Sequence, residues 1–423
     1  MIGFEEQMAI LERGVEQVAP REEFVRKLKR SIDTGKPLRV KYGIDPTGID
    51  VHLGHTVPLR KLRQFQDLGH QAVIIIGNYT ALVGDPSGRD ETRKALTREQ
   101  VEENAKDYLR QVGRIIDLDK AEVHANGDWF SKWTFLDVLD LTRKMTLGRI
   151  SAREDFAKRI KEEKPVYLHE CLYPLMQGWD SVEIRADVEL GGTEQLFSLL
   201  VARDLQEGRD QEPQVAMTMP ILVGTDGTRR MGKSLGNYIG VAEDPVTQFA
   251  KVMSIPDEPM RQYFTLLTDL PLSEVDGLLA SGSNPRDVKE RLGKAIVAQY
   301  SGVEAADHAA AEFRRRAAGD DPDEIPEFEV ALDPSGEPKL LAQLFVGVLG
   351  FDTSTSNVRR MLEQGGVNVG PERSVVRDPK TRLELDPATR RVRVVQTSDS
   401  LELDPDQVVV RYGKRKIARL RIV

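Results

Sequence analysis

The sequence predicts an α/β protein with a parallel sheet in its N-terminal half. Residues 71–77, QAVIIIG, form a short apolar run bounded by glycine, which is typical of a parallel strand buried on both faces. A second strand is expected at 38–44, followed by a helix at 54–68. Strand, helix and strand at this spacing predict a βαβ unit. A chain of 423 residues without a solenoid repeat is long enough for two or three domains.

The rest of the chain divides into an alternating, a helical and a mixed region. In the alternating region we expect helices and strands at 97–116, 134–163 (two helices), 166–179, 181–190 (strand), from the N-cap Thr193 onward (helix), and 215–223 (strand). Residues 245–318 are expected to be helical, and 319–339 have the Asp, Glu and Pro content of a linker. The mixed region should hold helices at 339–349 and 355–364 and strands near 393–396 and 407–411.

Composition excludes several classes of protein. Hydrophobic residues are 40% and charged residues 30%, as in ordinary soluble domains. No apolar run approaches the roughly 18 residues of a membrane helix, and the acidic start lacks a signal-peptide pattern. The single cysteine, Cys171, excludes an internal disulfide and a cysteine metal cluster. We therefore expect a cytoplasmic protein with no membrane partner.

Charge is distributed unevenly along the chain. Residues 339–423 carry 16 Lys and Arg against 10 Asp and Glu, a net charge of +6, although the whole chain has a net charge of −8. An acidic body with a basic tail predicts that the tail binds a polyanion.

Residues 134–150 carry more apolar side chains than one buried helix face needs. They are Leu136, Val138, Leu139, Leu141, Met145 and Ile150. This surplus predicts either additional core or a surface for a partner protein.

The most informative stretch is 41–55, KYGIDPTGIDVHLGH. Turn residues end the expected strand, and His52, Gly54 and His55 open the following helix. A strand, a tight loop and a helix start together form an anion site, because unpaired backbone N–H groups and the helix dipole point at one place. Gly54 leaves room for a flat ring on the backbone. The combination suits a nucleoside triphosphate, although two histidines can also simply begin an ordinary helix.

A second candidate site is the segment 230–234, RMGKS, in a glycine-rich loop after the last expected strand. Arg230 and Lys233 are two cations three residues apart with the hydroxyl of Ser234 beside them, and such a group can bind a polyphosphate. Glycines in the loop predict a mobile lid. Taken alone, the segment can equally be a solvated basic loop.

Together these two segments resemble the paired motifs of class I aminoacyl-tRNA synthetases. The sequence between them is similar to that of bacterial tyrosyl-tRNA synthetases, in the same order from about residue 5 to the C-terminus. The matching stretches are 42–47 (YGIDPT), 76–77 (IG), 84–88 (GDPSG), 173–180 (YPLMQGWD), 191–195 (GGTEQ) and 411–416 (RYGKRK).

The resemblance implies a domain organisation. It implies a Rossmann-like parallel-sheet catalytic domain at 1–240 with a helical dimer insertion at about 97–165, an α-helical domain on the anticodon side at 241–325, a linker at 326–338 and a small α+β S4-like RNA-binding domain at 339–423. It further implies a homodimer with tRNA(Tyr) spanning both subunits.

The resemblance also implies a two-step reaction on L-tyrosine, ATP and tRNA. Thr47, His52 and His55 would donate to the phosphates, and Arg230 and Lys233 would close over the departing pyrophosphate. The remaining ATP-binding positions would be Asp45, Gly54, Gly192, Glu194, Met231 and Ser234. Mg²⁺ would come with ATP, with no metal cage built from protein alone. RNA would be bound by Arg359, Arg360, Lys414, Arg415 and Lys416.

A third set of residues would hold tyrosine by the same resemblance. Asp85, Tyr173 and Gln177 correspond to the residues that bind the α-ammonium, and Asp180 to the one that receives the phenolic hydroxyl. Tyr173 and Gln177 are four apart and share a helix face. Gln195 would orient the reacting carboxylate. Lys41 and Asp45 complete the expected pocket. Without the resemblance, we would interpret these helix positions, Tyr173, Gln177 and Asp180, as a helix face packed on the sheet.

Four residues depart from the common family pattern. Arg230 stands where lysine is usual, and Gly232 replaces the first serine of the loop. Glu194 stands where aspartate usually binds the ribose, and Lys41 where some tyrosine enzymes place a tyrosine.

Three other functions remain open at this point. They are a paralogue that adenylates a tyrosine-like acid without charging tRNA, an RNA-binding protein with an inactive synthetase body, and a tryptophan enzyme of the same architecture. The basic tail disfavours the first, only the four departures support the second, and Asp180 disfavours the third.

Overall fold

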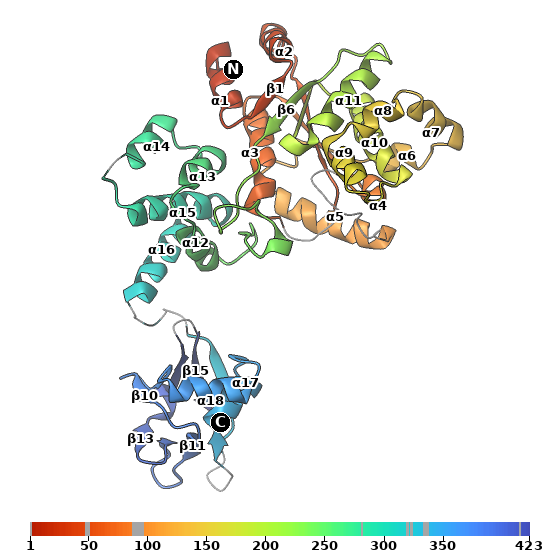
Figure 1. Cartoon of the computed structure of the whole chain (residues 1–423). Coiled ribbons are helices and arrows are strands. Elements are labelled where there is room, and N and C mark those ends of the chain that lie inside the picture. Colours follow the sequence, from red (N-terminus) through yellow and green to blue (C-terminus); the bar gives the residue numbers. More distant parts are fainter. Residues whose placement is uncertain are drawn as a thin grey trace. The chain divides into compact units, whose positions relative to one another are not determined.

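A computed structural model describes residues 2–46, 51–86, 97–280, 282–318, 321, 325–332, 338–413 and 416–423. The chain forms two compact units, Met1–Phe313 and Arg314–Val423 (Figure 1). None of the helices in these described ranges is long and apolar enough to cross a membrane.

The first unit is built on a six-stranded sheet in the order β1-β6-β5-β2-β3-β4. All neighbouring strands run parallel except the β1–β6 pair, which is antiparallel. The strands are β1 (Gln17–Ala19), β2 (Arg39–Ile44), β3 (Gln71–Ile76), β4 (Glu122–Ala125), β5 (Val188–Gly192) and β6 (Val215–Met219). The expected α/β class with a parallel, Rossmann-like sheet is confirmed.

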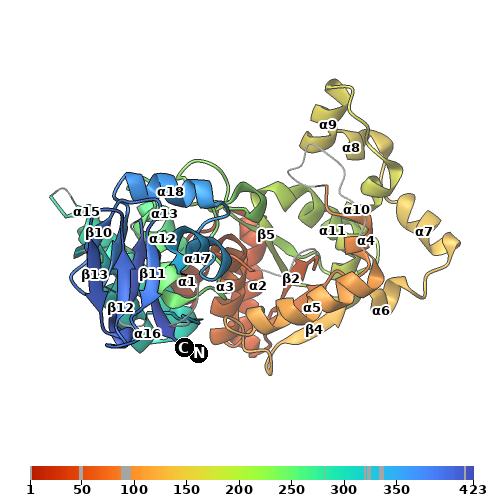
Figure 2. The same cartoon turned by 90° about the horizontal axis from the view of Figure 1, so that it is seen from below.

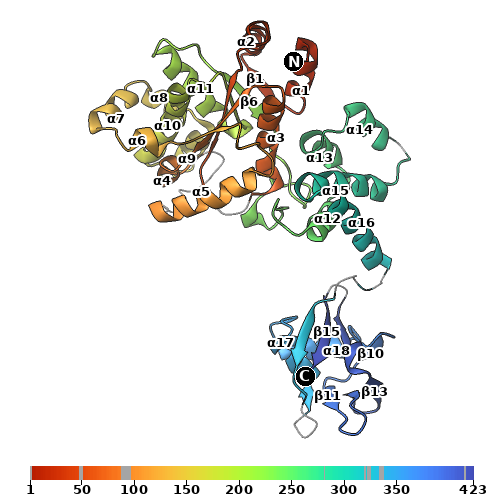
Figure 3. The ribbon, with the colours of Figure 1, turned by 180° about the vertical axis from the view of Figure 1, so that it is seen from behind.

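Helices cover both faces of this sheet (Figures 1 and 3). Alternate residues of β3 show why: Ile74 joins the cluster that includes α3, whereas Ile75 packs with Ile184 of α10. A strand with apolar residues on both faces needs a cover on each. The helices around the sheet are α1 (Phe4–Glu12), α2 (Arg21–Thr34), α3 (Leu53–Asp67), α4 (Thr80–Val83), α5 (Arg98–Val112), α6 (Gly127–Phe130), α10 (Leu168–Ile184) and α11 (Leu196–Glu207).

Three short helices lie together at one end of the first unit, beyond α10 (Figure 2). They are α7 (Phe135–Thr142), α8 (Leu147–Ser151) and α9 (Glu154–Lys161), where the sequence predicted two helices. Leu141 and Ile150 are buried here, but Leu136 stays exposed. The apolar surplus of 134–150 is therefore partly core and partly surface.

The C-terminal helices of the first unit share its main core. Tyr263, Phe264 and Leu292 belong to the same apolar cluster as the sheet residues Val40 and Met217. These helices therefore belong to one compact unit with the sheet, where the sequence suggested a separate domain at 241–325. They are α12 (Pro245–Met253), α13 (Met260–Leu267), α14 (Leu272–Leu278) and α15 (Pro285–Ser301). Helix α16 (Val303–Ala318) follows; its buried alanines form a separate cluster with Phe249, and its residues after Phe313 belong to the second unit.

Two local expectations between 181 and 196 were wrong. Residues 181–184 continue α10 instead of starting a strand, because Arg185 ends the helix with a left-handed φ of 52° and β5 begins only at Val188. Apolar and polar residues alternate from the last turn of the helix into the following strand, and this alternation predicted a single strand. Thr193 is not the N-cap of a helix; a 3-10 turn, Thr193–Gln195, precedes α11.

The second unit contains two antiparallel-rich sheets around a core of its own. Their orders are β10-β9-β14-β15-β7 and β13-β12-β11-β8. The elements are β7 (Glu327–Val330), β8 (Lys339–Leu340), α17 (Leu341–Gly347), α18 (Thr355–Glu363), β9 (Val367–Val369), β10 (Ser374–Val376), β11 (Arg382–Leu385), β12 (Val392–Val395), β13 (Ser400–Leu403), β14 (Val409–Tyr412) and β15 (Lys416–Ile422). Part of the segment expected as a linker, 326–338, is strand β7, which pairs in parallel with β15.

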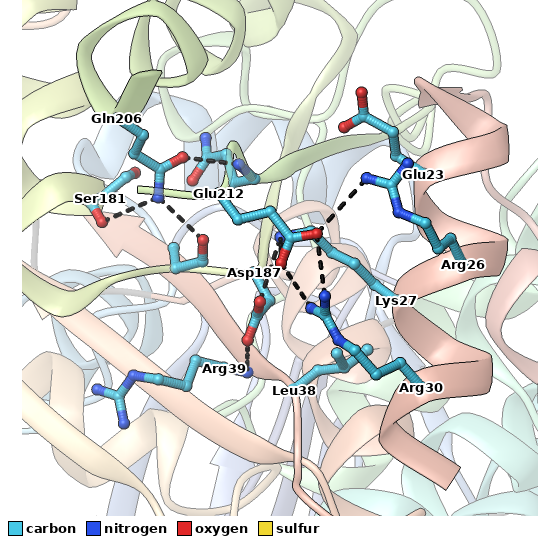
Figure 4. Close-up of polar contacts among 12 residues, drawn as sticks. Glu23, Arg26, Lys27, Arg30, Leu38, Arg39, Ser181, Asp187, Gln206 and Glu212 are labelled. Atoms are coloured by element: carbon cyan, nitrogen blue, oxygen red, sulfur yellow. Dashed lines mark hydrogen bonds and ion pairs between the residues drawn. The ribbon is translucent and has the colours of Figure 1, made fainter. Parts of the chain in front are cut away.

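A cluster of charges fastens α2 to the sheet (Figure 4). Lys27 is fully buried, and its Nζ lies 3.2 Å from Oδ1 of Asp187, the residue just before β5. The other oxygen of Asp187 accepts the backbone N–H of Arg39 at 3.0 Å, where β2 begins. Arg30 and Glu212 extend the cluster toward solvent with a 2.6 Å ion pair. One carboxylate thus joins a helix to two strands.

Replacing Lys27 by methionine should lower the free energy of unfolding by about 3 kcal/mol, because one partner of a buried ion pair is removed. Urea denaturation followed by circular dichroism measures the loss. As a control, Arg21→Gln breaks a pair with Glu12 whose side chains are 59% and 32% exposed, and should cost less than about 1 kcal/mol. Equal losses in the two variants would contradict the structural role of Lys27.

Candidate active site

The start of α3, which carries the first motif, is joined by backbone hydrogen bonds to residues 239–241, which follow the loop that carries the second motif. Val241 donates to the carbonyl of Val51, and Leu53 donates to the carbonyl of Ile239, each at 2.9 Å. His52 and Gly240 form the bridge between these two bonds. The start of α3 and the segment after the glycine-rich loop therefore form one short antiparallel ladder. The expectation that the histidines and the cationic loop meet at one place is supported by this geometry.

The side chains of the two motifs also meet. Met231 is buried, and a Cβ placed on Gly54 would lie 3.6 Å from its Cβ and 3.0 Å from the His52 ring. Gly54 therefore lies between an imidazole and the loop, and a larger residue would press on the His52 ring and contact Met231. Thr47, expected in the same site, lies outside the described residues.

The two histidines are stacked and neutral. Their ring centroids are 3.7 Å apart at 19°. Burial lowers the pKa of His52 to about 3, with a further contribution from His55, and burial lowers the pKa of His55 to about 4. Nδ1 of His55 accepts the backbone N–H of His52 at 3.3 Å. A neutral imidazole that accepts through Nδ1 carries its proton on Nε2, so His55 can donate one hydrogen bond.

The cationic loop is held by a buried asparagine. Oδ1 of Asn237 accepts from the backbone N–H of Gly232 at 2.9 Å, and its Nδ2 donates to Asp226 at 2.9 Å and to the carbonyl of Arg230 at 3.1 Å. Lys233 and the neighbouring Ser234 are exposed at the surface of the loop. The backbone of the loop is thus fixed while its cations face solvent.

A small cavity opens at the carboxyl ends of β2 and β3. It is lined by Gly43, Ile44, Asp45, Ile75, Gly77, Thr80, Tyr173, Gln177, Asp180 and Gln195. β3 and β5 flank β2 on opposite sides, so the chain changes direction in the sheet at this point. Ligands of open parallel sheets bind at such a switch point. The cavity brings together five of the residues expected to hold tyrosine.

Asp180 is the buried acid of this cavity. Its Oδ1 accepts from Trp129 Nε1 at 3.0 Å and its Oδ2 from Asn126 Nδ2 at 3.3 Å. Burial raises the pKa of Asp180 to about 7, although the charge of Lys41 and these two donors lower it. The carboxyl is therefore oriented by α6 and its N-cap and titrates near neutral pH.

Asp45 lies at the other side of the cavity. It accepts from the Thr80 hydroxyl at 2.7 Å and is hydrogen-bonded to Tyr173. A Cβ on Gly77 would come within 2.1 Å of its Oδ1, so only glycine fits beside it. The tyrosine hydroxyl of α10 and the acid at the end of β2 are thereby held together.

The 3-10 turn after β5 contributes the remaining polar groups. Gln195 accepts the Gly192 N–H through Oε1 at 3.0 Å, and its Nε2 lies 3.5 Å from Asp85. The carboxyl of Glu194 lies against the α-carbon of Gly192. Partial shielding from solvent raises the pKa of Glu194, Asp85 raises it further and Arg230 lowers it. Asp85, Glu194 and Arg230 are thus close enough to influence one another.

Lys41 departs from its expected place in the pocket. It is fully buried and absent from the described lining of the cavity, and its Nζ donates to the Gln177 carbonyl and to Ser181, both at 2.8 Å. The side chain is therefore engaged with α10 and β5 in the described structure.

Comparison with known proteins explains this arrangement. The family model of the tRNA synthetases class I (W and Y) matches residues 33–317, which contain both joined segments and the cavity. The chain belongs to this family.

Relatives within the family match the chain over nearly its whole length. A tyrosine–tRNA ligase of Moorella thermoacetica is 47% identical and covers 98% of this chain and 95% of its own. That of Symbiobacterium thermophilum is 48% identical, covering 98% and 97%. Class I synthetases depend on ATP, so ATP is a substrate of the synthetase site.

Solved structures share the fold at low identity. A C-terminally truncated mitochondrial tyrosyl-tRNA synthetase of Aspergillus nidulans has a TM-score of 0.61 at 22% identity, covering 74% of this chain and 94% of its own. The Archaeoglobus fulgidus synthetase complexed with L-tyrosine has a TM-score of 0.59 at 24% identity, covering 73% and 100%.

The expected RNA-binding residues lie in the second unit. Arg359 and Arg360 are exposed on α18, and Lys416 begins β15 with its Nζ bonded to the Phe351 carbonyl. Lys414 and Arg415 lie outside the described residues.

Several residues of the site escaped prediction from the sequence. They are Thr80, Asn126, Trp129, Glu189 and Asn237. Glu189 alone left a signal, since it is a charged residue inside an otherwise apolar strand. The others act on neighbours far away in the chain and look like ordinary loop or helix residues.

Replacing Asn237 by alanine should slow adenylate formation in this synthetase about tenfold or more, because the loop backbone at 230–232 loses the hydrogen bonds that fix it. The KM for the amino acid should stay within about twofold. Stopped-flow or pyrophosphate-exchange kinetics measures both. Asn284→Ala removes a comparable asparagine, the N-cap of α15, and should leave the rate unchanged; a similar slowing there would refute the specific role of Asn237.

Proposed function

We propose that this synthetase is a tyrosine–tRNA ligase. The carboxylate of L-tyrosine attacks the α-phosphate of ATP and expels pyrophosphate, and the tyrosyl group then passes to the 3′ end of tRNA(Tyr). The observation that carries the proposal is the buried acid Asp180 lining the same cavity as Tyr173 and Gln177. The names of the relatives that match over 98% of the chain support it.

The joined motifs supply the ATP side of the site. A neutral His55 offers an Nε2–H donor to phosphate oxygens, and the space over Gly54 accepts a flat ring. Arg230 and Lys233 sit on the loop that Asn237 fixes, where two cations stabilise the charge of departing pyrophosphate. Asp45, Gly192, Glu194, Met231 and Ser234 would complete the set of residues that contact ATP. Mg²⁺ arrives with ATP and is held mainly by its phosphates.

The cavity supplies the tyrosine side. Asp180 accepts the phenolic O–H, and Asp85, Tyr173 and Gln177 receive the ammonium group. Phenylalanine would enter without a hydroxyl and leave the buried Asp180 unpaired, which costs affinity. Gln195 lies at the Gly192 turn, on the side of the cavity where the carboxylate of the substrate must meet ATP.

The second unit supplies the surface for tRNA. Arg359 and Arg360, exposed on α18, and Lys416, exposed at the start of β15, supply positive charge suited to the phosphates of folded RNA. Lys414 and Arg415 precede Lys416 in the sequence and would add to this charge. This surface favours tRNA over a small acceptor, so the paralogue without tRNA charging is the weaker reading.

We further propose that the enzyme is a homodimer through the end of the first unit formed by α7–α10. Large apolar side chains are exposed there: Phe135, Leu136, Leu147, Ile160, Tyr167 and Leu168. Leu168 is 83% exposed and Leu147 is 75% exposed, values that a soluble monomer rarely tolerates in one region. A second copy of this chain with the same apolar face would cover them.

Purified enzyme should exchange pyrophosphate into ATP when tyrosine is added, and far less with phenylalanine or tryptophan. It should also charge tRNA with tyrosine. Exchange that needs tryptophan, or charging that never follows exchange, would overturn the proposal. As an internal control, His55→Ala should bind tyrosine normally in equilibrium dialysis yet lose most of its exchange rate.

Tyrosine binding should strengthen as the pH rises through 7. A phenolic O–H donates best to an ionised carboxylate, and the pKa of Asp180 in the free enzyme is about 7. The dissociation constant should fall by up to about tenfold between pH 6 and pH 8. Calorimetric titration measures it, and Asp180→Asn should flatten the profile. A flat wild-type profile would contradict an ionisable Asp180 in contact with the phenol.

Light scattering should give a mass of about twice 47.4 kDa for the wild-type enzyme. Leu168→Asp should shift the population toward monomer, because a charge would be buried at the centre of the apolar face. Val303 on α16 is also exposed, at 69%, but lies outside this face, so Val303→Asp should remain dimeric. Two monomeric variants, or two dimeric ones, would refute the proposed surface.

A further inference from the structure

A buried polar cluster lies directly beneath the tyrosine cavity. Lys41 of β2 and Glu189 of β5 are register neighbours in the sheet, and both side chains are fully buried. Lys41 Nζ lies 2.9 Å from Glu189 Oε1. The Ser181 hydroxyl donates to Glu189 Oε2 at 2.9 Å and is bonded to Lys41 as well. An ion pair this deep costs much to desolvate, so its retention calls for a function beyond stability.

Glu189 also controls the amide of Gln177. Gln177 Nε2 donates to Glu189 Oε1 at 3.0 Å. An amide group can normally turn over and exchange its oxygen and nitrogen, but an ionised carboxylate accepts hydrogen bonds only. The NH₂ of Gln177 must therefore face Glu189. Its Oε1 is then directed away from Glu189, and this buried atom has no hydrogen-bond partner among the described residues.

Lys41 holds the backbone of Gln177, whereas Glu189 holds its side chain. The ammonium of Lys41 binds the backbone carbonyl of Gln177, one turn before Ser181 on α10, and so holds the same turn of helix that carries the amide. The same ammonium group and the Ser181 hydroxyl also donate to Glu189, so this carboxylate acts as an acceptor. Backbone and side chain of Gln177 are thus held by two opposite charges at once.

We propose that the buried Lys41–Glu189 pair is a positioning device that locks the Gln177 amide with its carbonyl oxygen toward the cavity, where it accepts a hydrogen bond from the ammonium group of the amino acid. The proposal rests on the proposed function, because it takes the ligand of the cavity to be an amino acid. Lys41 and Glu189 do not touch the ligand; they act through Gln177.

Three ligands separate this role from general damage to the pocket. Tyrosine and tyramine both carry the ammonium group, and 3-(4-hydroxyphenyl)propionate has the phenol and carboxylate but no ammonium. Glu189→Gln keeps the size of the side chain but lets the neighbouring amide turn over. The variant should bind tyrosine and tyramine about tenfold or more weakly than the wild type, and bind 3-(4-hydroxyphenyl)propionate within about twofold of it. Calorimetry or equilibrium dialysis gives all three constants.

Equal weakening of all three ligands, or unchanged binding of tyrosine, would overturn the proposal. A wild-type enzyme that binds none of the three would instead overturn the proposed function. If Glu189→Gln does not fold, the double variant Lys41→Met with Glu189→Gln removes both charges and leaves none unpaired, and the same selective loss is expected of it.

Lys27→Met is the matched control. It also removes a fully buried ammonium group, but the two carboxylates described as its ion-pair partners, Asp187 and Glu212, do not line the cavity. It should lower stability while leaving the ratio of the tyrosine and 3-(4-hydroxyphenyl)propionate constants at the wild-type value. A shift of that ratio in Lys27→Met as large as in Glu189→Gln would show that lost stability alone explains the effect.

Discussion

The site depends on the short ladder between residues 51–53 and 239–241. Its two backbone bonds bring the start of α3 under the loop that carries Arg230 and Lys233. The start of α3 provides neutral donors and the loop provides cations, so a site for a triphosphate needs both segments. Burial of the two imidazoles in the folded unit lowers the pKa of each and so keeps both neutral.

The buried carboxyl groups around the cavity already have hydrogen-bond partners in the protein without a ligand. Asp180 is held by Trp129 and Asn126, and Asp45 by Thr80 and Tyr173. Such groups cost little reorganisation when the substrate binds, which is how a site of fixed dipoles favours a charged reaction. The free-energy cost of removing water from these groups arises earlier, during folding.

Much of the architecture could be read from the sequence, because β2, α3 and β3 carry strong local patterns. The end of helix α10 and the start of strand β5 could not be predicted. Apolar and polar residues alternate at the end of this helix, and the same alternation is typical of a strand. The identities at the two motif segments predicted which residues meet, but not what fixes them. Asn237 and Glu189 act through contacts between distant elements, which local sequence patterns do not reveal, although Glu189 stands out as a charge inside an apolar strand. The contacts of Lys41 with Ser181 and Glu189 could not be predicted for the same reason.

The antiparallel edge of the first sheet has a consequence for biosynthesis. β1 ends at Ala19, yet the only described strand it pairs with, β6, begins at Val215. A ribosome makes the chain from its N-terminus, so this first strand must wait for most of the unit to emerge before it finds its neighbour. During that interval its backbone groups stay open to wrong partners, which makes the nascent enzyme a natural client for chaperones.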